Sequence, residues 1–386
     1  MKFFHLSDLH IGLKLQNRDL KEDQELILNE IVNDASEEQP DAVLIAGDVY
    51  DKAVPSAESV EMFDSFLERL TKAVPSAEIL IISGNHDSAP RINCYRGLLT
   101  SHRVHMIGQP PLNPEEYIEK VTLTDAYGPV NFYLLPFVKP SMVRQVVGEE
   151  SDEASLSYDE TVRRLLAREQ IRETERNVLV SHQFYLPVGK TAEEVERMDS
   201  EIRTVGNIDQ VSAAYLAPFD YAALGHIHKP MTVGENRFRY CGTPLACSVS
   251  EAGQKKGILE VTLLAPGTPA DIRVLPLAPR KEVRVIKGSF ADVLAQGCDD
   301  YVTVVLTDTK DLDVVDMQDR LRAAFPFLLE IRRETVRGAD YTTGGGQVRE
   351  MDPFELCCSF VPELEEEEKN LLADVIRSVQ EQEENR

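Results

Sequence analysis

Short apolar runs alternate with amphipathic stretches along the first part of the chain. The run FFHLS (3–7) precedes a helical pattern over residues 19–35, AVLIAG (42–47) precedes another over residues 56–73, and EILIIS (78–83) leads into a turn. Continuous apolar runs of this length are typical of parallel strands that are buried on both faces. Because these runs alternate with helical patterns, the sequence predicts an α/β domain.

Later runs extend the same domain. A longer helical pattern covers residues 152–175. The further strand candidates are FYLLPF (132–137), NVLVSH (177–182), YAALGH (221–226), FRYCG (238–242) and GILEVTLL (257–264).

A segment dense in proline and glycine, residues 263–283, marks a change in the pattern. We expect a domain boundary there, with a large domain over residues 1–278 and a smaller α+β domain over residues 279–341. The predicted elements of the smaller domain are strands over residues 301–308 and 328–334 and a helix over residues 314–325.

The C-terminal residues form a third part. TTGGG (342–346) predicts a flexible joint, and two helical patterns follow it, over residues 352–361 and 365–383. The second has an apolar stripe, which favours packing against another surface. We therefore expect residues 350–386 to form a helix pair that binds a partner or packs on the small domain.

Composition indicates a globular protein without a membrane span. Of the 386 residues, 42% are hydrophobic and 28% are charged, and the N-terminus does not have the pattern of a signal peptide. We therefore expect a cytoplasmic location. The six cysteines form no CxxC pair and are expected to be buried free thiols.

The net charge of -25 argues against a basic nucleic-acid binder, which would need many lysine and arginine contacts to phosphates. Residues 350–386 contribute -9 of this charge, so the rest of the chain is also acidic. A polyanionic substrate would then need bound metal cations, or the basic surface of a partner, to offset the charge.

Polar side chains follow five of the predicted strands directly. They are Asp8 and His10; Asp48 and Asp51; Asn85, His86 and Asp87; His182; and His226 and His228. In an open α/β sheet, ligands bind in the crevice outside the carboxyl ends of the strands. We therefore expect these side chains to share one pocket.

The residue types in this set suit divalent metal ions. Carboxylates, imidazoles and one amide oxygen are ligands for manganese, iron or zinc, and no sulfur ligand accompanies them. The set is large enough for two ions, which Asp48 can bridge with its two oxygens. Gly47 and Gly84 let the backbone turn sharply beside these ligands. Each motif alone is compatible with a polar turn, but together they argue for a metal site, because buried charges without partners are costly.

The motifs DLH (8–10), GDVYD (47–51), GNHD (84–87), SH (181–182) and GHIH (225–228) resemble the five signature motifs of the calcineurin-like metallophosphoesterases. The residues that flank them are similar to those of the SbcD family, the nuclease subunits of a bacterial double-strand-break repair complex. The resemblance implies a four-layer αββα sandwich with a small α+β capping domain and C-terminal helices.

The resemblance also implies roles for the site residues. The implied ligands of two ions, most often Mn2+, are Asp8, His10, Asp48 and His228 for the first and Asp48, Asn85, His182 and His226 for the second. His86 would donate to the leaving oxygen, and the carboxylate of Asp51 would orient it. Asp87 is expected to fix the turn after His86. From its place shortly after GNHD, and not from the resemblance, Arg91 is expected to meet a DNA phosphate or to form a surface salt bridge.

The activity implied by the resemblance is metal-dependent exonuclease and endonuclease cleavage at DNA ends and hairpins, in DNA repair, recombination and replication. The implied partner is an SbcC-type coiled-coil ATPase that docks on residues 352–383, in a heterotetramer that contains a homodimer of this chain. The sequence has no P-loop, so ATP dependence would come from that partner. Two alternatives stay open: a stand-alone phosphoesterase that acts on nucleotides or phosphoproteins, and a scaffold without chemistry.

Overall fold

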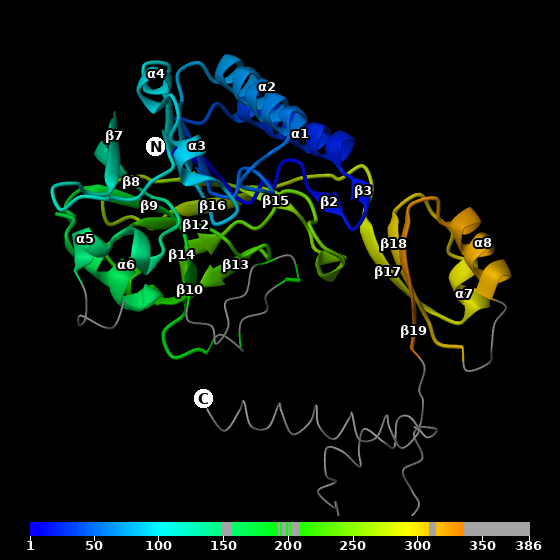
Figure 1. Ribbon diagram of the computed structural model, residues 1–386. Helices are drawn as coiled ribbons and strands as arrows, with labels where there is room; N and C mark the ends of the chain where they lie inside the picture. The colour runs from blue at the N-terminus through cyan, green and yellow to red at the C-terminus, as the bar shows by residue number, and fades with distance from the viewer. Residues whose placement is uncertain are drawn as a thin grey trace, which may run out of the picture. The chain divides into compact units, whose positions relative to one another are not determined.

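Two mixed six-stranded sheets pack face to face in the computed structural model, and helices cover their outer faces (Figure 1). The structure describes residues 1–148, 156–191, 209–308 and 314–334, together with Glu194, Met198, Asp199 and Glu201. The predicted joint at residues 342–346 and the predicted helix pair over residues 350–386 lie outside the described residues.

The first sheet has the strand order β16-β15-β1-β4-β5-β6. Its four parallel strands are β1 (Lys2–Leu6), β4 (Ala42–Ala46), β5 (Glu78–Ile82) and β6 (Val104–Ile107), and its antiparallel edge is formed by β15 (Gly257–Thr262) and β16 (Asp271–Pro276). The long helices α1 (Lys21–Glu38) and α2 (Ala57–Ala73) pack on its outer face.

Strand β4 shows why the apolar runs are continuous. Val43 and Ile45 belong to the core beneath α1 and α2, whereas Leu44 belongs to the core between the two sheets. All three side chains are fully buried. A strand with core on both faces needs apolar residues at every position, which explains the absence of alternation in the sequence.

The second sheet has the order β13-β14-β12-β9-β8-β7. Its strands are β7 (Glu119–Asp125), β8 (Gly128–Leu135), β9 (Arg176–His182), β12 (Tyr221–Gly225), β13 (Met231–Val233) and β14 (Glu235–Tyr240). The short helices α5 (Arg144–Val147) and α6 (Tyr158–Ala167) pack on its outer face.

The helix predicted over residues 152–175 is shorter in the structure. Within the described residues it is α6, which begins after its N-cap Ser157 and ends at Ala167. Beyond that end, the Arg168 guanidinium donates to the carbonyl oxygen of Val146, and the Glu169 carboxylate accepts from the amide of Ile118. These contacts with other segments hold the chain outside the helix.

Shorter elements lie in the connections between these strands and helices. They are the strands β2 (Lys14–Leu15), β3 (Arg18–Asp19), β10 (Phe184–Leu186) and β11 (Gln210–Ser212), the helices α3 (Ala89–Ile92) and α4 (Arg96–Thr100), and the 3-10 turns Pro140–Met142, Ala213–Leu216 and Val249–Glu251. Of the helices that the structure describes, none has the length and apolar character needed to cross a membrane.

Residues 283–308 and 314–334 form a separate parallel sheet of β17 (Val283–Gly288), β18 (Tyr301–Leu306) and β19 (Leu328–Arg333), with α7 (Phe290–Leu294) and α8 (Val314–Ala324). This small domain has its own apolar core. The hydroxyl of Tyr301 donates to Asp23 of α1 at 2.7 Å, which ties the small domain to the first sheet's helices.

The cysteines only partly follow the expectation. The four that the structure describes are free thiols, and Cys241 and Cys247 are buried as expected. Cys94, between α3 and α4, is exposed and Cys298 is only partly buried, so the prediction of burial is wrong for these two.

Candidate metal centre

The predicted site residues meet where the two sheets present the ends of their parallel strands. Asp8 and His10 follow β1, Asp48 follows β4, and Asn85 and His86 follow β5 of the first sheet. His182 is the last residue of β9, and His226 and His228 follow β12 of the second sheet. Strands from both sheets therefore contribute, and the chemistry of the site depends on how the sheets pack together.

The backbone is strained at these strand ends. Asp8, His10, Asp48 and His226 have φ angles of +53°, +42°, +49° and +100°, which residues other than glycine rarely adopt. Each such residue costs on the order of 1–3 kcal/mol and persists only where its surroundings hold it. Here the amide of Asp8 donates to the carbonyl oxygen of Gly47 at 2.9 Å, and the amide of His10 donates to that of Asp48 at 3.0 Å.

Two carboxylates and one imidazole form the centre of the site. Nε2 of His182 lies 3.3 Å from Oδ2 of Asp48 and 4.0 Å from Oδ1 of Asp8, and all three side chains are buried. Nδ1 of His182 contacts the carbonyl oxygen of Ala46 at 2.7 Å, so it carries a proton and Nε2 faces the carboxylates.

The charged side chains of this group shift one another's pKa values. Burial lowers the pKa of His182, but the carboxylates of Asp48 and Asp8 outweigh burial and raise it to about 9. Burial likewise raises the pKa of Asp48, but the charge and hydrogen bond of His182 outweigh it and hold that pKa well below its usual range. The two carboxylates therefore favour a positive charge beside them, which a divalent cation would also supply.

A second group lies beside the first. Nε2 of His10 is 3.1 Å from Nε2 of His228 and 3.8 Å from Oδ2 of Asp48. Burial lowers the pKa of His10 well below its usual value, so this ring is neutral. Its other nitrogen, Nδ1, is buried and has no hydrogen-bond partner in the part of the chain that the structure describes.

Asn85 links the remaining two histidines. Its Oδ1 lies 2.8 Å from Nδ1 of His226 and 3.0 Å from Nε2 of His182. The two imidazole rings lie 5.4 Å apart between centroids. Phe137 stacks on the His226 ring at 6.5 Å and closes this side of the site with an apolar surface.

The donor set fits divalent cations. Within the described residues, ligand atoms of Asp8, Asp48 and His182 all lie within 4.8 Å of one another. Facing imidazole nitrogens, buried carboxylates and one amide oxygen are ligands that a metal ion of the manganese type accepts. Cys247, which is not in the predicted ligand set, forms a group of the same size with His10 and His228. Burial keeps this thiol protonated, since it raises the Cys247 pKa well above its usual value.

His86 lies next to these residues and is only partly buried. Its amide donates to Oδ1 of Asp48 at 2.8 Å, and its ring packs edge-on against His10. Nδ1 of His86 contacts the backbone carbonyl oxygen of Asp51 at 2.9 Å. Asp51 is therefore the partner of His86, as predicted, but it contacts His86 through its backbone carbonyl oxygen and not through its carboxylate. The Asp51 carboxylate instead lies 4.0 Å from Nδ1 of His10.

Residues 1–230 match the model of the calcineurin-like phosphoesterase family. The chain belongs to this family. A second family model, SbcD_C, described as the type 5 capsule protein repressor C-terminal domain, matches residues 279–363.

Solved structures similar to this phosphoesterase include TT1561 of Thermus thermophilus, a dimetal phosphatase from Danio rerio and GAP50, the anchor in the inner membrane complex of Plasmodium. All three are 13% identical to it. In the same order, they cover 67%, 72% and 73% of this chain and 93%, 99% and 90% of their own, with TM-scores of 0.37, 0.36 and 0.34.

As a phosphoesterase, the protein is a metal-dependent hydrolase. Divalent cations bound by these residues would polarise a phosphate ester and offset its negative charge. Nδ1 of His86 contacts the Asp51 carbonyl oxygen, so Nε2 is the ring nitrogen that would meet a substrate oxygen.

The turn after His86 is held by Asp87. Its carboxylate accepts from the amides of Val49, Tyr50 and Gly84 at 3.1, 2.9 and 2.9 Å. Burial raises the pKa of this carboxyl to about 6. The residue thereby joins the loops after β4 and β5.

Arg91 is exposed on α3, and its guanidinium forms no ion pair with any residue that the structure describes. The salt bridge that the sequence allowed for Arg91 is therefore not found among those residues.

Sequence reasoning missed a set of buried polar residues behind the ligands. Glu201, Glu251 and Lys256 are each less than a tenth exposed, and all three contact His228. No motif points to them, because each is a single charged residue outside the long helices and strands.

Proposed function

We propose that this protein is the nuclease subunit of a DNA double-strand-break repair complex, of the SbcD type. It hydrolyses phosphodiester bonds at DNA ends and hairpins with two Mn2+ ions. The observation that carries the proposal is the SbcD_C match over residues 279–363, which follows the phosphoesterase match over residues 1–230 in the chain. The phosphoesterase site supplies hydrolysis, and the second match supports the narrower substrate.

We propose the following roles for the site residues. The metal ligands are Asp8, His10, Asp48, Asn85, His182, His226 and His228. His86 donates a proton or hydrogen bond to the leaving oxygen, held by Asp51. Its contact with the Asp51 carbonyl and its partial exposure support this role. Arg91, exposed and without an ion pair in the described structure, meets a DNA phosphate.

We propose three domains and one principal partner. Residues 1–278 carry the nuclease site, residues 279–341 cap it, and residues 350–386 dock on an SbcC-type coiled-coil ATPase. The complex contains two copies of each chain. The acidic charge of this chain supports a partner, because DNA binding then needs basic surface from elsewhere.

Cleavage of defined substrates tests the proposal. The protein is incubated with Mn2+ and blunt or hairpin duplex DNA, with and without the ATPase, and separately with small nucleotide esters. We expect duplex cleavage that the ATPase stimulates. Rapid turnover of nucleotide esters without duplex cleavage would instead identify a stand-alone phosphoesterase.

The His86→Ala variant tests the role of His86. Loss of a general acid lowers the rate by roughly 10²- to 10⁴-fold, while the bound Mn2+ stays at the wild-type amount. His102→Ala is a matched control, because His102 is an exposed histidine at the opposite end of the strands. Equal activity of the two variants would remove His86 from the mechanism.

Deletion of residues 350–386 tests the partner surface. We expect loss of co-purification with the SbcC-type ATPase and unchanged hydrolysis of nucleotide esters. Association that persists would show that another segment docks on the ATPase.

A further inference from the structure

Glu251 is a buried carboxylate that the metal ligand set does not include. It ends the 3-10 turn Val249–Glu251 and is 1% exposed. Its Oε1 lies 3.5 Å from Nδ1 of His228, the ring nitrogen that faces away from His10. A carboxylate in this position contacts the imidazole from behind.

The Glu251 carboxylate is fixed by donors on both oxygens. Oε2 accepts from Nζ of Lys256 at 2.6 Å and from Oγ1 of Thr243 at 2.9 Å. Oε1 accepts from the amide of Cys247 at 3.1 Å and from the Ser248 hydroxyl at 3.2 Å. These contacts leave the carboxylate little freedom to turn away from His228.

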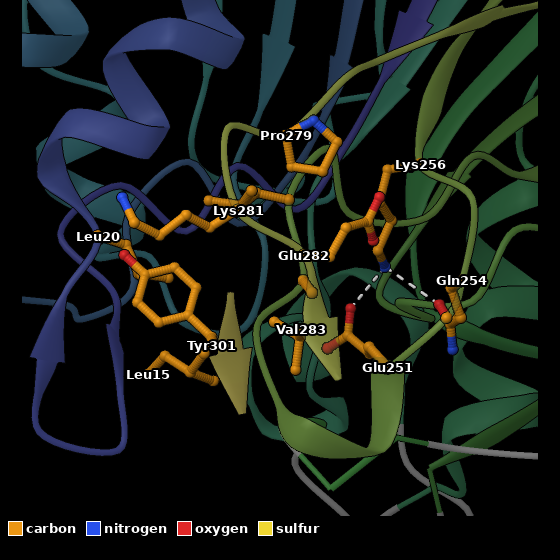
Figure 2. Close-up of a pocket in the computed structure, with 13 residues that line it drawn as sticks. Leu15, Leu20, Glu251, Gln254, Lys256, Pro279, Lys281, Glu282, Val283 and Tyr301 are labelled. Carbon is orange, nitrogen blue, oxygen red and sulfur yellow. Dashed lines mark hydrogen bonds and ion pairs between the residues drawn. The ribbon is translucent and has the colours of Figure 1, made fainter. Parts of the chain in front are cut away.

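Glu251 and Lys256 form an ion pair that is buried inside the protein. Figure 2 shows Lys256 pointing toward Glu251 and Gln254 at the wall of a cavity that Pro279 and Lys281 also line. The cavity holds about 20 Å³, space for about one water molecule. Electrostatic interactions there are stronger than at the surface.

The backbone of His228 is held by the same group. Its amide donates to Glu201 at 3.0 Å, and its carbonyl oxygen accepts from Thr243 at 3.2 Å and from Lys256 at 3.4 Å. With the backbone fixed and Nδ1 directed at Glu251, Nε2 is left to face His10 at 3.1 Å.

We propose that Glu251 is a positioning residue of the metal centre. Its carboxylate accepts a hydrogen bond from Nδ1–H of His228, so the lone pair of Nε2 is presented to a divalent cation. Lys256 and Thr243 hold the other oxygen of Glu251 in place. Metal-ligating histidines commonly donate their second nitrogen to a carboxylate, and loss of that carboxylate costs about 10- to 100-fold in metal affinity. The inference rests on the proposed role of His228 as a ligand.

The variant Glu251→Gln tests this directly. The ammonium of Lys256 attracts the amide oxygen of the new side chain, so its NH2 group faces His228. His228 then accepts at Nδ1 and carries its proton on Nε2, where the cation binds. We expect one of two Mn2+ ions to bind about 10- to 100-fold more weakly and the other within about twofold of wild type.

Isothermal titration of the metal-free full chain with Mn2+ measures both affinities, and thermal unfolding in EDTA measures the fold without metal. Asp125→Asn is the matched control, because Asp125 pairs with the buried Arg176 at the start of β9, the opposite end from His182. This control should lower stability in EDTA without changing either Mn2+ affinity.

A second measurement needs no variant at Glu251. Nitrogen-15 NMR of the histidines in the metal-free wild type, with the His228→Gln spectrum as assignment, should show His228 protonated at Nδ1.

Protonation of His228 at Nε2 alone, or Mn2+ affinities of Glu251→Gln equal to those of the wild type, would overturn the inference. Failure of the wild type to bind two Mn2+ ions would overturn the metal site itself. Intact Mn2+ binding without DNA cleavage would overturn only the proposed nuclease function and leave the Glu251 inference supported.

Discussion

The Gly84→Ala substitution places a single methyl group against the centre of the site. A Cβ atom at Gly84 would lie 2.1 Å from Oδ1 of Asp48 and 2.4 Å from its amide nitrogen. Real Cβ atoms essentially never come within 3.0 Å of such neighbours. The Asp48 carboxylate would therefore have to retreat by about 1 Å, the difference between these distances.

Displacement of Asp48 should lower both the stability of the fold and the rate of hydrolysis. Overpacking of a rigid interior costs about 1–3 kcal/mol of stability. Asp48 also contacts His86 and His182, so its retreat disturbs the arrangement on both sides. A misplacement of about 1 Å at a reacting centre lowers the rate by on the order of 10²-fold. We expect Gly84→Ala to lower hydrolysis by about that factor and to weaken Mn2+ binding.

Hydrolysis of a chromogenic phosphodiester, Mn2+ titration and urea unfolding in EDTA measure these effects. Gly97→Ala is the matched control, because a Cβ at Gly97 in α4 meets nothing within 4 Å. Alanine there should leave activity unchanged. A Gly84→Ala variant with wild-type rate, metal affinity and stability would refute the close approach of the two loops.

Other predictions test separate contacts. Asp51→Asn should lower hydrolysis less than about tenfold, in the same assay, because His86 bonds the Asp51 backbone carbonyl, which the substitution keeps. Asp125→Asn should cost about 1–3 kcal/mol at pH 7 in urea unfolding. Arg176 holds the pKa of Asp125 well below its usual value, so this stabilisation is complete above about pH 4 and lost as the pH falls through the native pKa. The difference from wild type should therefore shrink at about pH 3. Mn2+ at about 100 times its Kd should raise the free energy of unfolding by about 2.7 kcal/mol per site, measured by urea titration.

The strand ends of the site could be predicted from the sequence because they are local features. The run EILIIS was expected to form a strand over residues 78–83, and β5 covers Glu78–Ile82. Asn85 and His86 come shortly after this run in the sequence, so their place near the end of the strand could be predicted without the structure. Parallel pairing of β4 with β5, and of β9 with β12, brings the corresponding ends to one edge of each sheet. Pattern and pairing together indicate the location of the site.

Other features depended on contacts that local patterns do not contain. The partner of His86 is a backbone carbonyl oxygen, and every residue carries one, so the sequence cannot distinguish it from the carboxylate of Asp51. Cys247 enters the site from a segment without a metal motif. The end of α6 depends on what Arg168 and Glu169 contact elsewhere. In each case the deciding partner is distant in sequence or chemically generic.

Two ion pairs, the partly buried Arg176–Asp125 and the buried Lys256–Glu251, show that the geometry of such a pair decides its role. A buried pair is often no more stabilising than apolar residues of the same volume, so burial alone does not explain why Glu251 and Lys256 are charged. Arg176 also donates to the carbonyl oxygens of Leu263 and Leu264, so its pair with Asp125 ties separate segments together. Glu251 instead directs one oxygen at Nδ1 of His228, and its contacts with Thr243, Cys247 and Lys256 come from its own neighbourhood in the sequence. The first pair joins parts of the fold, whereas the second orients one side chain. That difference is the reason to assign Glu251 to the chemistry of the site rather than to stability.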